Sequence, residues 1–211
     1  MTAPGETGRA PGETGRAPSE TGRAPGPDKS DFAMLDEEPI FDGHVFSLGR
    51  VEATDPDGQH FAREVVRHPG AVSVVALHDD GTVTLVRQHR VAVGTAVLEA
   101  PAGTCDNAGE DAVDTARREL AEEAGLVARH IEPLGTIFNS PGYTDQRTRL
   151  FLATGLDECQ KSPAGIEERW LTVERVSLSH VEALVATGRL LDATTIVGLL
   201  LARSKWTPPV P

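Results

Sequence analysis

The chain has 211 residues, 39% of them hydrophobic, which is enough for one good-sized domain with a packed core and an appendage. Its formal net charge of −12 argues against a general nucleic-acid-binding surface. Two cysteines without metal-ligand spacing, no apolar run long enough to span a membrane and no apolar signal segment favour a reduced, cytoplasmic protein without membrane partners.

The first 36 residues are predicted to form a disordered, low-complexity tail. Residues 3–26 repeat Ala-Pro-Gly-Glu-Thr-Gly-Arg with a period of seven. A period of seven can indicate a coiled coil, but each unit lacks a large apolar residue and contains helix breakers. Such a composition cannot bury enough apolar surface to fold by itself.

A small N-terminal β-hairpin subdomain is predicted over residues 37–68. Its two strands, at 45–53 and 59–66, flank Asp55-Pro56-Asp57-Gly58, a strong turn signal. Two strands alone are barely stable in water, so this hairpin is expected to need a partner surface.

The main domain is predicted over residues 69–206, with a short C-terminal tail at 207–211. Strands are expected at 71–78, 82–88, 96–100, 133–138, 148–154 and 170–176. Helices are expected at 111–124, from a capping box at Ser179 to Gly188, and from Asp192 to about residue 204. Strands around an internal helix, with two helices at the end, predict an α/β fold in which helices cover both faces of a mixed sheet.

The helix predicted at 111–124 carries the strongest chemical signal. Glu119, Glu122 and Glu123 fall at i, i+3 and i+4, so their carboxylates share one face. Like charges at this spacing repel, and Arg118 reaches Glu122 at i+4 without neutralising all three. A hard divalent cation such as Mg²⁺ would do so through oxygen ligands. The alternative is a solvated acidic face with simple ion pairs.

These residues form part of a recognisable motif. Glu110, seven residues and then Arg118-Glu119-Leu120-Ala121-Glu122-Glu123-Ala124-Gly125-Leu126 resemble the Nudix box of hydrolases that act on nucleoside diphosphates linked to another group. Gly103 lies one residue farther from Glu110 than in the usual box, a loop insertion that leaves the carboxylate spacing intact.

Several segments outside the box are similar to the ADP-ribose pyrophosphatase subfamily. They are Arg63-Glu64-Val65-Val66, Gly70-Ala71-Val72, Val86-Arg87-Gln88-His89-Arg90, Glu99-Ala100-Pro101-Ala102-Gly103, Ser140-Pro141-Gly142-Tyr143-Thr144-Asp145 and Leu191-Asp192-Ala193-Thr194-Thr195. The resemblance implies a Nudix α/β/α sandwich and hydrolysis of ADP-ribose to AMP and ribose 5-phosphate with Mg²⁺ or Mn²⁺. It also implies a homodimer in which the N-terminal strands of one subunit help to enclose the partner's site.

Two alternatives remain open at this point. One is the same chemistry on another nucleoside diphosphate derivative, such as ADP-glucose, GDP-mannose or NADH. The other is a non-catalytic domain that senses ADP-ribose or NAD metabolites, although the intact carboxylates and the lack of a basic helix-turn-helix speak against it.

The resemblance assigns roles residue by residue. The expected metal ligands are Glu119, Glu122, Glu123 and the backbone carbonyl of Ala102. Residues expected at the substrate are Arg63, Arg90, Phe46, Gly103 and Gly142. Arg90 would grip a phosphate, although a lone arginine at a strand end is more often a surface charge. Phe46 would stack on the adenine, or else belong to the core of the hairpin.

The general base is expected on the loop before the last strand. Glu167 and Glu168 are both candidates, and counting back from Val176 favours Glu167. Glu122 is a further catalytic candidate. At Gln146 the subfamily usually has Glu, which puts a supporting role of that position in metal or water binding in doubt.

Overall fold

The computed structural model describes residues 31–107, 109–162 and 165–206. The tail predictions for residues 1–30 and 207–211 lie outside these ranges. None of the helices in the described ranges is long and apolar enough to cross a membrane.

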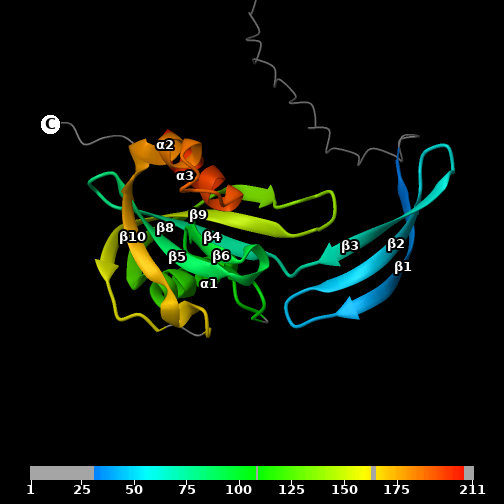
Figure 1. Ribbon diagram of the computed structural model, residues 1–211, viewed down its shortest axis with the longest axis horizontal. Coiled ribbons are helices and arrows are strands. Elements are labelled where there is room, and N and C mark those ends of the chain that lie inside the picture. The colour runs from blue at the N-terminus through cyan, green and yellow to red at the C-terminus, as the bar shows by residue number, and fades with distance from the viewer. Residues whose placement is uncertain (1–30, 108, 163–164, 207–211) are drawn as a thin grey trace, which may run out of the picture.

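A mixed seven-stranded sheet forms the centre of the main domain (Figure 1). Its strands are β4 (Ala71–Leu77), β5 (Thr82–Arg90), β6 (Thr95–Glu99), β7 (Ala102–Thr104), β8 (Leu126–Phe138), β9 (Arg147–Glu158) and β10 (Thr172–Ser177). The main path runs β10-β5-β4-β9-β8, with β6 paired to β5 and β7 paired to β4. Strands β4 and β9 are parallel and the other paired strands are antiparallel.

Helices cover both faces of this sheet. Helix α1 (Ala112–Glu119), continued by a π-helical turn (Leu120–Ala124), lies on one face, and α2 (Val181–Ala186) and α3 (Ala193–Lys205) lie on the other (Figure 1). Each face has its own apolar core. The predicted α/β/α sandwich with a mixed sheet is therefore confirmed.

The C-terminal end of α3 is tied to the turn between β4 and β5 by an aromatic contact. Trp206 follows the helix and its ring packs directly against Gly81, in the turn between β4 and β5. Gly81 has φ +77°, a backbone conformation that favours glycine. The ring of Trp206 also contacts the apolar core beneath α2 and α3.

The N-terminal part is a separate three-stranded antiparallel sheet that stands beside the main domain (Figure 1). It consists of β1 (Ala33–Asp42), β2 (Ser47–Thr54) and β3 (His60–Arg67). The predicted hairpin corresponds to β2 and β3, whereas β1 was not predicted. Because β1 begins at Ala33, the boundary that placed residues 33–36 in the tail is wrong. All ten residues of β1 are exposed, so the strand lacks the apolar alternation that identifies a half-buried strand.

Other differences from the predicted elements have local causes. Strand β8 begins at Leu126, seven residues before the predicted start. The chain from Leu126 to Glu132 pairs with the far end of β9, where few residues are buried and the apolar pattern is weak. The predicted capping box at Ser179 is also wrong, because Ser177 caps a 3-10 turn (Leu178–His180) that precedes α2.

Candidate active site

The carboxylates of the predicted motif sit on a helix whose ends are well defined. The side chain of Asp111 accepts a hydrogen bond from the backbone N–H of Val113 and caps α1. Gly125, directly after the predicted last residue of the helix, ends the π-helical turn with φ 67°, a backbone conformation that favours glycine. A stripe of small and apolar residues holds the helix on the sheet: Ala112, Ala116, Leu120 and Ala124 are all buried.

The last turn of this helix is wider than predicted. The sequence predicted one α-helix from residue 111 to 124, but residues 120–124 form a π-helical turn in which the N–H of Gly125 also reaches the carbonyl of Leu120. Single π-helical turns inside α-helices are rare and are frequent at functional sites. The widened turn still leaves both Glu119 and Glu123 facing the sheet.

Glu119 and Glu123 are buried against the start of β7. Their exposed fractions are 7% and 4%. The carboxylate of Glu123 accepts a hydrogen bond of 3.0 Å from the backbone N–H of Ala102. The carboxylate of Glu119 lies so close to Gly103 that a Cβ at this position would collide with it. The helix and the Ala102–Gly103 backbone thus meet at a single point.

Burial governs the charge of these two groups. It raises the pKa of Glu119 to about 7, although the ion pair with Arg118 opposes the shift. It raises the pKa of Glu123 to about 8, against the hydrogen bond from Ala102. The negative charge of Glu122 adds to the raised pKa of Glu119, that of Glu119 adds to the raised pKa of Glu123, and that of the nearby Glu168 adds to both. Removal of water therefore makes two ionised carboxylates here costly without a cation.

Arg118 is the cation that lies among the acidic residues. Its guanidinium contacts Glu119 at 2.7 Å, Glu122 at 3.0 Å and Glu110 at 3.2 Å. The pair with Glu122 is the predicted i,i+4 contact. Hydrogen bonds from Arg118, followed by those from Asn107 and Thr115, lower the pKa of Glu110 to about 2. One arginine thus touches three carboxylates but not Glu123.

These residues suit a hard divalent cation by their chemistry. Glu119, Glu122, Glu123 and the carbonyl of Ala102 offer oxygen atoms only, which Mg²⁺ and Mn²⁺ prefer. Burial raises the pKa of Glu119 and of Glu123 although Arg118 and Arg90 oppose the shifts, so a further cation would favour the ionised form of both carboxylates. Within the described residues, however, no three Asp, Glu, His or Cys side chains are already arranged to hold a metal ion. The carboxylates of Glu119 and Glu122 are paired with Arg118 instead.

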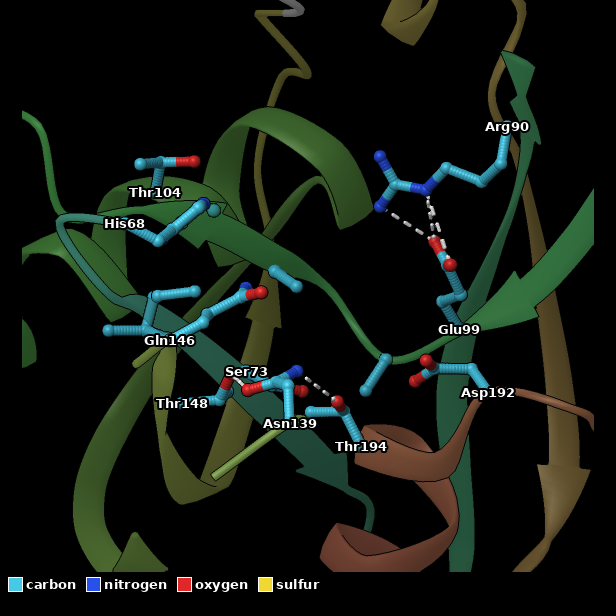
Figure 2. A pocket seen from close by; sticks show the side chains of 15 residues that line it. His68, Ser73, Arg90, Glu99, Thr104, Asn139, Gln146, Thr148, Asp192 and Thr194 are labelled. Atoms are coloured by element: carbon cyan, nitrogen blue, oxygen red, sulfur yellow. Dashed lines mark hydrogen bonds and ion pairs between the residues drawn. The ribbon is translucent and has the colours of Figure 1, made fainter. Parts of the chain in front are cut away.

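A cleft of about 330 Å³ opens beside the Ala102–Gly103 backbone (Figure 2). Arg90 reaches over it from the end of β5 and forms an ion pair of 2.8 Å with Glu99. Hydroxyl and amide side chains line the opposite wall: Ser73, Thr104, Asn139, Gln146, Thr148 and Thr194. Asp192, at the N-terminus of α3, completes the rim beside Glu99 (Figure 2).

The loop with the two candidate bases approaches the helix from the side of β10. Glu168 begins a 3-10 turn (Glu168–Trp170) and is half-buried, whereas Glu167 is exposed. The charge of Glu168 contributes to the raised pKa values of both Glu119 and Glu123. Glu168 is thus the closer of the two in electrostatic terms, although the sequence favoured Glu167. Trp170, the last residue of the turn, is 83% exposed.

Three of the predicted substrate residues do not line the cleft. Phe46 is 45% exposed and packs on Phe41 in the N-terminal sheet, so it is not a core residue of the hairpin. Arg63 lies in β3, with its guanidinium over the ring of Phe61. Gly142 lies on the exposed loop between β8 and β9, with open space around it.

Sequence reasoning did not assign a role in the site to several cleft residues. Glu99 and Asp192 stood in segments quoted for their resemblance, and Asp192 was otherwise predicted only as the residue that caps the last helix. The cap is confirmed, because Asp192 accepts a hydrogen bond of 2.7 Å from the N–H of Thr195. Asn139 links the loop between β8 and β9 to Thr148 of β9 and to Thr194 of α3 on one wall of the cleft. Only the alternation of strands β5 and β6 could have pointed to Glu99.

Comparison with known proteins supports the reading of the motif. The NUDIX domain profile matches residues 67–189, which include the helix, the cleft backbone and the loop with Glu168. The chain belongs to the Nudix family. It is a Nudix hydrolase, which disfavours the non-catalytic sensor considered from the sequence.

Similar proteins extend the match over most of the chain. It is 36% identical over 177 residues to an ADP-ribose pyrophosphatase of Mycobacterium tuberculosis, covering 84% of this chain and 86% of the relative. It is 35% identical over 159 residues to an ADP-ribose pyrophosphatase of Bacillus subtilis, covering 75% and 85%. A crystal structure of an ADP compounds hydrolase has the same Nudix fold, with a TM-score of 0.73 and 23% identity over 85% of this chain and 96% of the other.

Proposed function

We propose that this Nudix hydrolase cleaves the diphosphate of ADP-ribose to AMP and ribose 5-phosphate, with Mg²⁺ or Mn²⁺ as cofactor. The observation that carries the proposal is the meeting of Glu119 and Glu123 with the Ala102–Gly103 backbone beside the cleft. The two ADP-ribose pyrophosphatases that resemble this chain over most of its length support the choice of substrate.

Each group around the cleft has a task in this reaction. Glu119, Glu122, Glu123 and the carbonyl of Ala102 would hold the divalent cations. Divalent cations held by these residues would supply charge neutralisation for the diphosphate and would lower the pKa of water. Arg90 would contact a phosphate oxygen and orient the diphosphate. The hydroxyl and amide side chains on the opposite wall would hydrogen-bond the sugar.

The general base would come from the loop before β10. Glu168 is our first candidate, because it is half-buried and its charge acts on Glu119 and Glu123. It would accept a proton from the attacking water while the bond from phosphorus to the bridging oxygen breaks. Glu167, one residue earlier and exposed, is the second candidate.

We also propose that the N-terminal sheet forms the interface of a homodimer. The sheet stands beside the main domain, and seven large apolar side chains on or next to it are 44–70% exposed. They are Phe32, Met34, Leu35, Ile40, Phe41, Val45 and Phe46. In such a dimer Phe46 and Arg63, which do not line the cleft of their own chain, would act at the partner's site.

Kinetics on purified variants test the metal ligands. We expect Glu119→Gln and Glu123→Gln to lower the rate of AMP release from ADP-ribose at least about 100-fold. A bound cation stabilises the transition state by several kcal/mol, and each loss of about 1.4 kcal/mol slows the reaction tenfold. Glu132→Gln, which removes an exposed partner of Lys205, is the control. Near-wild-type turnover of both Glu119→Gln and Glu123→Gln would refute the assignment.

A panel of substrates at matched concentrations tests the leaving group. ADP-ribose should give the highest kcat/KM, ahead of ADP-glucose, GDP-mannose and NADH. A clear preference for one of the other three would keep the diphosphate chemistry and replace the substrate.

In the same assay Glu168→Gln should lower kcat about 100- to 10,000-fold, the usual contribution of a general base, whereas Glu167→Gln should not.

A further inference from the structure

Arg90 does not extend past the end of its strand, as an arginine in that position would if it were left to solvent. In the β5–β6 hairpin Arg90 lies opposite Thr95, whereas Glu99 lies opposite Val86. The two positions are four residues apart along β5, which corresponds to about 13 Å of extended chain. Their side chains share one face of the hairpin, because opposed residues point the same way and the alternation has a period of two.

The guanidinium nevertheless reaches the Glu99 carboxylate. Its Nε donates to both carboxylate oxygens at 3.2 and 3.0 Å, and its Nη2 lies 2.8 Å from Oε2. Arg90 therefore folds back along the hairpin toward the cleft (Figure 2). Contact through two nitrogens fixes the orientation of the planar group as well as its position.

Of the two partners, Glu99 is the fixed one. Its side chain is 11% exposed, against 42% for Arg90. The next residue, Ala100, donates its N–H to the Thr195 hydroxyl at 2.8 Å, and that hydroxyl donates to Asp192 at 2.6 Å. The end of β6 is thus tied to the first turn of α3, and the carboxylate determines where the guanidinium lies.

We propose that Glu99 is a positioning residue, which holds the Arg90 guanidinium over the cleft so that its remaining nitrogen, Nη1, contacts a phosphate oxygen of the substrate. Nη1 makes no hydrogen bond or ion pair within the part of the chain that the structure describes. The inference rests on the proposed function, since it places the diphosphate in this cleft. Glu99 itself does not touch the substrate.

A double-mutant cycle separates this role from a general contribution to the fold. The variants are Glu99→Gln, Arg90→Ala and the two combined, in the full chain with Mg²⁺. Their ADP affinity is measured by calorimetry and their kcat/KM on ADP-ribose by kinetics. Glu99→Gln alone should weaken ADP binding about tenfold and lower kcat/KM at least as much, mainly through KM, because a displaced guanidinium loses the phosphate contact.

In the Arg90→Ala background the same Glu99 change should alter both quantities less than about twofold. Equal losses in both backgrounds, or unchanged ADP binding in Glu99→Gln, would overturn the inference. Glu174→Gln is the matched control, since it breaks a similar pair with Arg87 on the same strand, 2.7 Å long and outside the cleft. If Glu99→Gln does not fold, Glu99→Asp, which keeps the charge on a shorter side chain, should still weaken ADP binding only when Arg90 is present.

The two readouts also distinguish the proposals from each other. Coupled effects on ADP binding in a protein that hydrolyses none of the substrates would support the role of Glu99 and refute the proposed function. Hydrolysis without any coupling would do the reverse. A wild-type chain that does not bind ADP would refute the role of Glu99.

Discussion

Single side chains decide how much charge the site carries at neutral pH. Glu119 and Glu123 have pKa values of about 7 and about 8, because burial disfavours their ionised forms. In the unfolded chain both groups titrate near 4.5. At a pH between the unfolded and folded pKa values, the folded protein therefore still holds protons that the unfolded chain has released.

The first prediction concerns stability against pH without divalent cations. A carboxyl group whose pKa is raised on folding stabilises the fold when the pH is below its pKa in the unfolded chain. This contribution is lost as the pH rises through its pKa in the folded protein. In EDTA the melting temperature should fall by several degrees between about pH 5 and pH 8, with a shallower fall in Glu123→Gln. Thermal melts at half-unit intervals measure both slopes. Parallel slopes in wild type and Glu123→Gln would contradict the assignment of the shift to Glu123.

The second prediction concerns the close approach of Gly103 to Glu119. Gly103→Ala adds a methyl group that collides with the Glu119 carboxylate and must displace it. Because a shift of about 1 Å in a catalytic group costs on the order of 100-fold, kcat/KM should fall by that factor. Gly135→Ala is the control, since its Cβ would meet Leu201 at an ordinary 3.9 Å. Full activity of Gly103→Ala would show that Glu119 has no fixed place in catalysis.

At the scale of elements, the end of β3 is joined to the loop that borders the cleft. The N–H of Val66 donates to the carbonyl of Tyr143 at 2.8 Å, and the N–H of Asp145 donates to Val66 at 3.3 Å. The carboxylate of Asp145 accepts from Arg67 and from the N–H of His68. Arg67 also pairs with Glu37 of β1. The N-terminal sheet and the cleft loop are therefore expected to move together.

The third prediction follows from this junction. Asp145→Asn removes the charge that ties the loop to Arg67, which then keeps only Glu37 of β1 as its ion-pair partner among the described residues, so the loop should loosen and KM for ADP-ribose should rise several-fold while kcat changes less. Hydrogen exchange at the Val66 amide, measured by NMR, should become faster. Asp157→Asn, which breaks the exposed pair with Arg129, should change neither quantity. An unchanged KM together with faster exchange at Val66 would mean that loop mobility does not affect binding.

The sequence predicts those elements whose start, buried face and end are all marked by residues close together in the chain. The motif helix was predictable because its cap, its apolar stripe and its stop at Gly125 all lie within fifteen residues. Strand β1 was not, since none of its residues is buried. The Arg90–Glu99 pair was not either, because it depends on how a side chain folds back along a hairpin. Local patterns predict elements, whereas contacts across the sheet complete the site.

At the scale of the whole molecule, the N-terminal sheet exposes apolar side chains that a single chain leaves uncovered. An exposed apolar surface of this kind, on a sheet beside the main domain, commonly marks a protein interface. Its outer strand, β1, carries acidic residues and Pro39, which discourage pairing of strand edges. The faces of the sheet, rather than its edge, are thus expected to meet the second copy.

The fourth prediction tests that association. Phe41 packs on Phe46, and Phe41→Ser should convert the dimer to a monomer. Light scattering after size-exclusion chromatography should then show a fall in mass from about twice 22.4 kDa to 22.4 kDa. KM should rise as well, because Phe46 and Arg63 would no longer reach the partner's cleft. Val127→Ser changes a residue of comparable exposure, 46% against 55%, on β8 and is the control. A wild-type monomer at micromolar concentration would refute the dimer.

The exposed position of Trp170 has a practical consequence. The chain contains two tryptophans. The other one, Trp206, follows α3 and packs on Gly81 in the turn between β4 and β5. In a Trp206→Phe protein all indole emission would come from the residue two positions after Glu168. A shift of that emission to shorter wavelength on addition of a nucleotide would report closure of this segment directly, in real time and without a chemical label.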